Sequence, residues 1–178
     1  MINETYITRR ILSDENLNKI NFIKDTLLEW HDGLKSAHGM THQMKKNMES
    51  SNEDINKIIM NSIDRDELFF DYAAPKQSGA VILSKMGKDC YYKPHHDSPT
   101  LGDFSTTVFL SNKNDYEGGE LCILHDGKEV KIKLDAGEAV TYKTGTPHRV
   151  NKVISGERLV AVFWTKTFIK DDFMREIY

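Results

Sequence analysis

The sequence predicts a mainly β fold with some α-helix, in which N-terminal helices support a sandwich or jelly roll of short strands. Two observations lead to this prediction. Apolar residues recur at helical spacing in the first third of the chain, whereas short β-branched and aromatic segments follow from residue 68 onward. Turn residues separate these segments, and closely spaced short strands are typical of a sandwich or jelly roll.

The length and composition predict one globular domain over 1–178, with 1–66 mainly helical support and loop and 67–178 the β core. A net charge of −3 gives no signature of nucleic-acid or membrane binding. Cys90 and Cys122 do not form a disulfide framework. The chain also lacks a long apolar run and an apolar signal core. We therefore expect a cytoplasmic protein, and its oligomeric state stays open.

Two amphipathic helices are predicted, over 13–30 and over 52–63, because each carries an apolar stripe at helical spacing. Ser13 fits the N-cap of the first helix. The segment 31–47 between them is polar and poor in large aliphatic residues, so it is predicted to be a long loop. We interpret this loop as a lid that closes over the substrate.

Strands are predicted wherever a β-branched or aromatic run is bounded by turn residues. The predicted strand segments are 68–74, 80–86, 89–97, 105–111, 119–126, 129–135, 137–143 and 157–168.

Two histidines and an aspartate form a candidate metal site. His95 and Asp97 alternate along a predicted strand, so both side chains point to one face. His148 lies about four predicted strands later, which is enough chain to cross a jelly roll and return. Two histidines and one carboxylate are the ligand set of non-haem Fe(II) oxygenases. His96 points to the opposite strand face, so we assign it to solvent or to a supporting role.

Arg158 is the candidate residue for binding an acidic co-substrate. Alternation along 157–168 places Arg158, Val160, Val162 and Trp164 on one face, which is predicted to be the interior of the barrel. A buried arginine needs a partner, and a carboxylate fits its planar fork with two parallel hydrogen bonds. Together with the iron ligands, this arrangement indicates a dioxygenase that depends on Fe(II) and 2-oxoglutarate.

The chain resembles the PKHD-type hydroxylases, relatives of the prolyl 4-hydroxylases within the Fe(II)/2-oxoglutarate oxygenases. The matching stretches are EWHDGLKSAHG (29–39), MKKN (44–47), TVFLSNKNDYEGGELCI (107–123) and TPHRVNKVISGERLVAVFWTKTFIKDD (146–172). The resemblance implies a double-stranded β-helix, or jelly roll. It also implies Fe(II) as cofactor, 2-oxoglutarate as co-substrate and ascorbate as a reductant.

The resemblance implies roles for individual residues. His95, Asp97 and His148 would bind iron, and Arg158 would bind the 2-oxoglutarate carboxylate. Four further positions match residues around the family's pocket. Thr107 and Phe109 would line the co-substrate pocket, Trp164 would form its wall, and Tyr92 would lie on the substrate side. No catalytic residue beyond the metal ligands is expected.

The sequence departs from the family pattern at Lys85, where prolyl hydroxylases commonly have a tyrosine that contacts 2-oxoglutarate. PKHD-type members also usually continue past the last strand into a longer helical tail. The resemblance implies hydroxylation of a peptidyl proline in a peptide or protein partner, with release of succinate and carbon dioxide. The alternatives are hydroxylation of a free amino acid or small metabolite, or a cupin-like metal-binding or sensing module without turnover.

Overall fold

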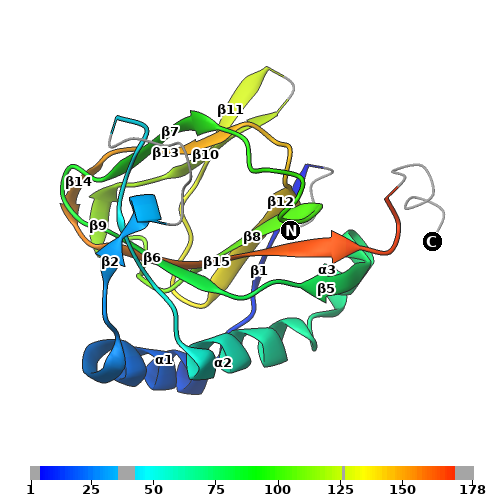
Figure 1. Ribbon diagram of the computed structural model, residues 1–178, viewed down its shortest axis with the longest axis horizontal. Coiled ribbons are helices and arrows are strands. Elements are labelled where there is room, and N and C mark those ends of the chain that lie inside the picture. The colour runs from blue at the N-terminus through cyan, green and yellow to red at the C-terminus, as the bar shows by residue number, and fades with distance from the viewer. Residues whose placement is uncertain (1–4, 36–42, 126, 171–178) are drawn as a thin grey trace.

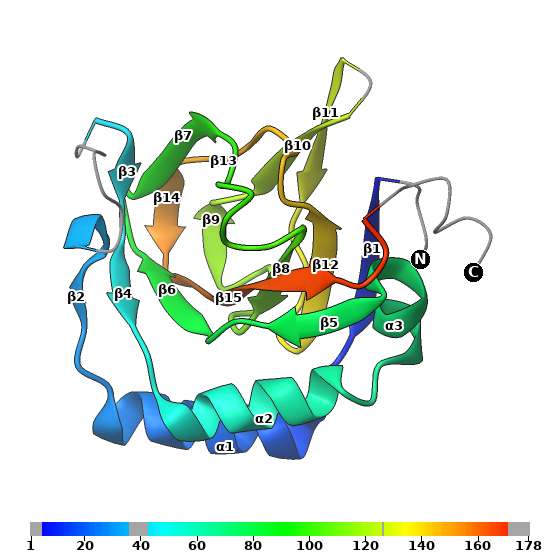
Figure 2. The same cartoon turned by 45° about the vertical axis from the view of Figure 1, so that its right-hand side comes forward.

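The computed structural model describes residues 5–35, 43–125 and 127–170 of the chain. Two antiparallel sheets face each other, and α1 (Asp14–Leu27) and α2 (Glu53–Ile63) lie side by side beneath the larger sheet (Figures 1 and 2). This arrangement is the jelly roll with supporting helices that the sequence predicts.

The larger sheet has the order β1-β12-β8-β15-β6-β4-β2, and β5 pairs with the end of β15. Its strands are β1 (Tyr6–Arg10), β2 (His31–Asp32), β4 (Met48–Ser50), β5 (Pro75–Ser78), β6 (Ile82–Met86), β8 (Phe104–Phe109), β12 (Glu138–Lys143) and β15 (Arg158–Thr167). The long β15 lies near the middle of this sheet, between β8 and β6, so its inward face lines the barrel.

The smaller sheet has the order β11-β10-β13-β7-β3, and β14 and β9 form a separate two-stranded ribbon. Its strands are β3 (Lys45–Lys46), β7 (Tyr91–His95), β10 (Leu121–His125), β11 (Lys128–Ile132) and β13 (His148–Val150). The ribbon consists of β9 (Tyr116–Gly118) and β14 (Val153–Gly156).

Two apolar clusters hold the layers together. One packs the helices against the outer face of the larger sheet, and the other fills the barrel between the sheets. Strand β15 contributes to both clusters by alternation, since Leu159 and Ala161 face the helices while Val160 and Val162 face the barrel. The larger sheet is therefore covered on both faces, and one of these faces forms the wall of the interior.

The helices begin where the sequence provides caps. The Ser13 side chain accepts a hydrogen bond from the Asn16 backbone N–H at 3.2 Å, which confirms the predicted start of α1. Asn52 caps α2 in the same way. Helix α1 ends at Leu27 and the next residue, Leu28, is extended, so the helix is shorter than the predicted 13–30.

The prediction of a strand over 68–74 is wrong, because this segment belongs to α3 (Glu67–Ala73). The Asp66 side chain accepts a hydrogen bond from the Phe69 backbone N–H at 3.2 Å and caps the helix. Phe69 and Ala73 lie one helical turn apart and are both buried. An aromatic run with a capping aspartate suits a helix as well as a strand, and packing onto the sheet decides between them.

The N-terminal part of the chain contributes more to the sheets than predicted. Strands β1, β2 and β4 join the larger sheet and β3 joins the smaller one. The described ends of the predicted loop 31–47 contain regular structure, namely β2, a 3₁₀ turn at Gly33–Lys35 and β3. Residues 36–42, the centre of the predicted lid, lie outside the described residues.

None of the described helices combines the length and apolar character needed to cross a membrane.

Candidate active site

Strands β7 and β13 place the two predicted histidine ligands opposite each other. The strands pair antiparallel, and His95 and His148 are direct partners in the register. Asp97 follows the end of β7. Facing positions on neighbouring strands bring side chains within a few ångströms of each other, so the pairing of β7 with β13 brings the two histidines together.

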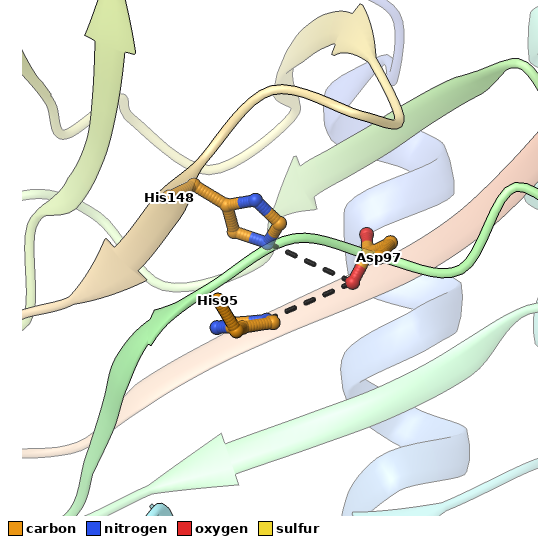
Figure 3. Close-up of side chains that lie close together, drawn as sticks. All are labelled: His95, Asp97 and His148. Carbon is orange, nitrogen blue, oxygen red and sulfur yellow. Dashed lines mark ion pairs between the residues drawn. The ribbon is translucent and has the colours of Figure 1, made fainter.

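The three side chains converge on one point (Figure 3). Asp97 Oδ1 lies 3.6 Å from His95 Nε2 and 3.8 Å from His148 Nε2. One ligand atom from each residue lies within 4.8 Å of the other two. Two imidazole nitrogens and a carboxylate oxygen at this spacing suit a divalent transition metal such as Fe(II).

Backbone carbonyls fix the orientation of both imidazole rings. His95 Nδ1 lies 2.8 Å from the Lys93 carbonyl oxygen, and His148 Nδ1 lies 2.9 Å from that of Thr146. A carbonyl only accepts, so each Nδ1 carries the proton and each Nε2 keeps its lone pair for a metal. His95 Nε2 is buried without a hydrogen-bond partner. Burial, and next the neighbouring His148, lower the pKa of His95 to about 4, which keeps the ring neutral.

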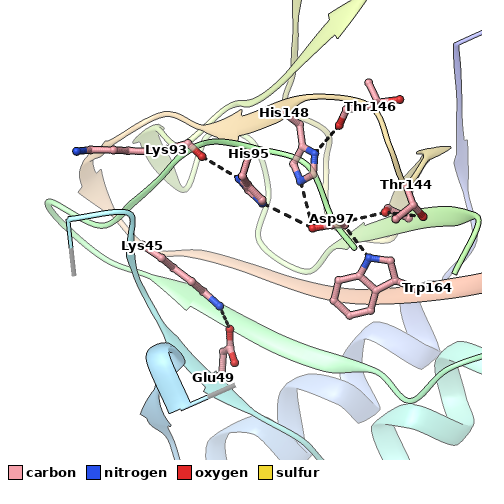
Figure 4. Close-up of polar contacts among 10 residues, drawn as sticks. Lys45, Glu49, Lys93, His95, Asp97, Thr144, Thr146, His148 and Trp164 are labelled. Atoms are coloured by element: carbon pink, nitrogen blue, oxygen red, sulfur yellow. Dashed lines mark hydrogen bonds and ion pairs between the residues drawn. The ribbon is translucent and has the colours of Figure 1, made fainter. Parts of the chain in front are cut away.

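Asp97 is held by two donors on its other oxygen. Asp97 Oδ2 accepts hydrogen bonds from Ser105 Oγ at 3.0 Å and from Trp164 Nε1 at 2.9 Å (Figure 4). Because these donors occupy Oδ2, Oδ1 is the oxygen that faces the histidines. Trp164, predicted as a pocket wall, lines the cavity and also orients this carboxylate.

A cavity of about 330 Å³ lies between the two sheets beside the three residues. Alternation along β15 predicts which of its side chains face the interior, and all four of them line this cavity: Arg158, Val160, Val162 and Trp164. The cavity wall is largely apolar apart from a few polar groups, which is typical of a site for a small ligand.

Arg158 is a buried cation inside the barrel. Its side chain is 2% exposed, and the Arg158 Nε finds no acceptor among the described residues. Met86 Sδ lies 4.0 Å from Nη1 and the Phe109 ring centroid lies 5.6 Å from Cζ, and the Tyr116 hydroxyl is a further neighbour of the guanidinium. Burial lowers the pKa of Arg158, and Tyr116 and Tyr142 offset part of that effect. In the described part of the chain no carboxylate pairs with this guanidinium, and a buried cation of this kind is a site prepared for an anion.

The remaining predicted residues surround the same cavity at different depths. Thr107 lines it, whereas Phe109 is fully buried beneath the Arg158 guanidinium. Tyr92 lines the cavity and stacks on His95, with ring centroids 3.6 Å apart. His96 is exposed at the rim.

Lys85 is not at the co-substrate pocket. Its Nζ lies 4.2 Å from the Trp30 ring centroid, on the face of β6 that points away from the barrel. The β6 residues that line the cavity are Ile82, Ser84 and Met86. Alternation along β6 therefore puts Lys85 on the wrong face for the contact that the family tyrosine makes.

Sequence reasoning missed Tyr142, which lines the cavity from β12 with its ring 5.3 Å from that of His148. Burial, and next the Asp97 carboxylate, raise the pKa of Tyr142 well above its ordinary value, so its hydroxyl keeps its proton. It also missed Ser105 and the buried polar residues Lys45, Asn47 and Glu49. The available signals were the alternation of Ser105 with Thr107, and the position of Lys45 and Asn47 in the MKKN stretch.

Comparisons with known proteins agree with this geometry. A sequence model of the family described as the 2OG-Fe(II) oxygenase superfamily matches residues 81–166. A PKHD-type hydroxylase of Prochlorococcus marinus (strain AS9601) is 34% identical over 181 residues, covering 96% of this chain and 82% of the relative. A PKHD-type hydroxylase of Psychrobacter sp. (strain PRwf-1) is 32% identical over 188 residues, covering 97% and 73%.

Two solved structures have a similar fold. A prolyl-4-hydroxylase from Pseudomonas putida aligns with a TM-score of 0.69 and 15% identity over 92% of each chain. A prolyl hydroxylase from Trichoplax adhaerens, solved with a peptide fragment of hypoxia inducible factor, aligns with a TM-score of 0.71 and 13% identity, covering 92% of this chain and 84% of the other. At these identities the likeness shows the fold alone.

Proposed function

We propose that this chain, which belongs to the 2OG-Fe(II) oxygenase superfamily, hydroxylates a prolyl residue within a peptide or protein. Members of this family are 2-oxoglutarate-dependent dioxygenases, and the chain matches PKHD-type hydroxylases over nearly its whole length. The observation that carries the proposal is the convergence of His95, Asp97 and His148 at the edge of a cavity that also contains the buried Arg158.

The three residues fit Fe(II) as ligands. His95 Nε2 is an orphaned buried nitrogen, and its ring is neutral, as a metal ligand must be. The two Nδ1–H groups and the two donors to Asp97 Oδ2 would hold the ligand atoms in place before the ion arrives. Three ligands on one side leave coordination positions open for other groups.

Arg158 fits the distal carboxylate of 2-oxoglutarate. The guanidinium lies inside the barrel, carries an unpaired Nε and would form a charge-assisted pair with an anion. The neutral Tyr142 hydroxyl and Thr107 lie along the wall between Arg158 and the histidines, where they can donate to or line the same ligand. Phe109 supports the guanidinium from below and Trp164 closes the wall beside Asp97.

Bound iron would supply the redox chemistry, in which dioxygen oxidises 2-oxoglutarate to succinate and carbon dioxide and transfers its second oxygen atom into a substrate C–H bond. The chain's own residues bind and orient the reactants and exclude water from an apolar cavity. We assign no separate acid or base. Ascorbate would act as an external reductant that keeps the iron in its reduced state.

A peptide substrate is supported by the Trichoplax relative in fold, which was solved with a peptide fragment. Tyr92, stacked on His95 at the cavity rim, would contact the substrate. A free amino acid or small metabolite is the alternative, because a cavity of about 330 Å³ also suits a small molecule. Arg158 argues against a binding module without turnover. We place the protein in the cytoplasm, where Cys90 and Cys122 stay reduced.

The test is a turnover assay with Fe(II), 2-oxoglutarate and ascorbate, supplied with proline-containing peptides or with free amino acids. We expect succinate formation coupled to a peptide mass gain of one oxygen atom, and no gain when iron or 2-oxoglutarate is left out. Faster turnover of a free amino acid than of any peptide would favour the alternative substrate. Failure to bind Fe(II) or 2-oxoglutarate would contradict the proposed function itself.

A further inference from the structure

A buried polar network lies in the cavity wall on the side of His95, outside the residues assigned above. Lys45, Asn47 and Glu49 are 7%, 5% and 4% exposed, and all three line the cavity. Figure 4 shows the Lys45 side chain meeting that of Glu49 on the same side of the site as His95, whereas Trp164 lies beside Asp97. Apart from Asp97 and Arg158, no other Lys, Arg, Asp or Glu among the described residues lines the cavity, so the Lys45–Glu49 pair is an unusual feature of its wall.

The network is built around an ion pair. Lys45 Nζ forms a short hydrogen bond to Glu49 Oε1 and a longer one, of 3.3 Å, to the Gly33 carbonyl oxygen. Asn47 Nδ2 donates to Glu49 Oε1 at 3.1 Å and to Ser84 Oγ at 2.8 Å. These bonds fix Glu49 and Asn47 against β6, so the position of the Lys45 ammonium is set by its surroundings.

The Lys45 ammonium can donate one more hydrogen bond than the two described above. An ammonium has three N–H groups, and within the described parts of the chain Lys45 hydrogen-bonds to Glu49 and Gly33 only. Its Nζ also lies 5.3 Å from the Tyr92 ring centroid, and that ring stacks on His95. The third N–H is therefore available inside the cavity, one aromatic ring away from the proposed metal ligand.

The charges in the loaded site determine which substrate group can pair with the Lys45 ammonium. In the loaded site, Fe(II) and Arg158 balance Asp97 and the 2-oxoglutarate dianion, while Lys45 balances Glu49. Among the described residues that line the cavity, the formal charges therefore already cancel when the metal and 2-oxoglutarate are bound. A buried charge without a partner of its own is unfavourable, whereas a neutral carbonyl needs only one donor.

We propose that Lys45 donates a hydrogen bond to a neutral carbonyl oxygen of the substrate, and that Glu49 sets this preference by neutralising Lys45. The substrate class is then a residue within an amide-linked chain and not a free α-amino acid, whose carboxylate would meet Glu49 as well as Lys45. This inference rests on the proposed function, because it concerns the substrate of the same site.

The test is calorimetric binding to the full chain loaded with Mn(II) and 2-oxoglutarate. The probes are N-acetyl-proline methylamide, which is neutral, N-acetyl-proline, which is an anion, and free proline, which is a zwitterion. We expect the neutral probe to bind the parent chain more tightly than the other two. Lys45→Met should weaken the neutral probe by roughly tenfold or more, the usual effect of losing a hydrogen bond to a charged group.

Two further variants separate recognition from structural support. Lys46→Met is the matched control, since Lys46 is the exposed neighbour of Lys45 on β3, and it should bind the neutral probe like the parent. Glu49→Gln removes the neutralising charge, so it should shift the preference toward the anionic probe. Affinity for 2-oxoglutarate should stay within about threefold in Lys45→Met, because Arg158 and the metal ligands are intact.

Several results would overturn the inference. One is that Lys45→Met binds the neutral probe as tightly as the parent does. Another is that the parent binds a charged probe more tightly than the neutral one. A third is that the loaded parent chain binds none of the probes. Loss of 2-oxoglutarate binding in Lys45→Met would show that the network only supports the fold. If the parent chain failed to take up Mn(II) or 2-oxoglutarate, the proposed function would fail instead, so the two failures are distinguishable.

Discussion

The hydrogen bonds around Asp97 show how single residues prepare a metal site before a metal is bound. Ser105 and Trp164 both donate to Oδ2, and Ser105 lies 3.2 Å from Thr144 Oγ1 in turn. Carboxylates with fixed orientation bind metals better than mobile ones, because less conformational freedom is lost on binding. The indole N–H of Trp164 is therefore as important to this site as its aromatic surface.

Trp164→Phe keeps the aromatic wall and removes the donor to Asp97. We expect it to weaken Mn(II) binding by roughly tenfold, at the lower end of the usual effect for hydrogen-bond partners of metal ligands. Calorimetric titration of the metal-free chain measures this. Trp30→Phe is the matched control, because Trp30 contacts Lys85 outside the cavity. Equal Mn(II) affinity in Trp164→Phe and the parent would contradict the positioning role.

Arg158→Ala should reduce 2-oxoglutarate affinity by at least about tenfold, since a hydrogen bond to a charged group contributes roughly 1.5–3 kcal/mol. Arg158→Lys should restore the affinity only in part, because lysine lacks the planar fork. The measurement is 2-oxoglutarate binding to the Mn(II)-loaded chain. Arg10→Ala is the control, as Arg10 is an exposed residue of β1 paired with Asp14. Unchanged affinity in Arg158→Ala would remove Arg158 from the co-substrate site.

At the scale of elements, a buried ion pair joins α3 to β1, the edge strand of the larger sheet. Arg9 and Asp66 form a short salt bridge, with side-chain exposures of 7% and 11%. Arg9 Nη1 also donates to Thr141 Oγ1 at 2.7 Å, and Arg9 Cζ lies 5.3 Å from the Phe69 ring centroid. Asp66 therefore acts both as the N-cap of α3 and as the partner of a buried cation.

Asp66→Ala should lower the free energy of unfolding by about 3–5 kcal/mol, because it leaves the Arg9 guanidinium buried without a counter-charge. Urea unfolding followed by circular dichroism measures the change. Ser13→Ala is the comparison, since it removes a cap at the exposed start of α1 and should cost only about 1 kcal/mol. If the two variants lost similar free energies of unfolding, the Arg9–Asp66 ion pair would add no stability beyond that of the helix cap.

In the whole molecule, the proposed ligands bridge the two sheets. His95 and His148 belong to β7 and β13 of the smaller sheet, whereas Arg158 and Tyr142 belong to β15 and β12 of the larger one. Metal and co-substrate held between them would cross-link the barrel. Ligands that bind only the folded state stabilise it in proportion to the logarithm of their concentration over the dissociation constant.

Mn(II) at a hundredfold excess over its dissociation constant should stabilise the chain by about 2.7 kcal/mol, and a chelator should reverse the effect. Thermal unfolding with and without Mn(II) measures this. His95→Ala should abolish the stabilisation, because it removes one of the three ligands. His96→Ala should keep it, since His96 is exposed and lies outside the converging group. If His96→Ala lost the stabilisation by Mn(II) and His95→Ala kept it, the wrong histidine would have been assigned as a ligand.

The helices and strands differ in how far the local sequence could predict them. The β-rich core, α2 and the start of α1 carry strong local signals, namely alternation, an apolar stripe and a serine cap. Residues 68–74 carry an aromatic run that fits either structure, and the cap at Asp66 together with burial of Phe69 and Ala73 makes them helical. The short strands β2, β3 and β4 have little local signal, because pairing with distant strands defines them.

By itself, the sequence determined the family, the jelly-roll class, the interior face of β15 and the residue types that converge on the metal site. The family follows from resemblance over four stretches of sequence, and the others follow from alternation and motif spacing, which are local properties of the chain. Only the tertiary structure decided that Tyr142 faces His148, that Trp164 donates to Asp97, that Lys85 points away from the barrel and that Lys45 enters the cavity with Glu49. These contacts join residues on different strands, and strand pairing and register depend on the whole packed molecule and not on any local pattern.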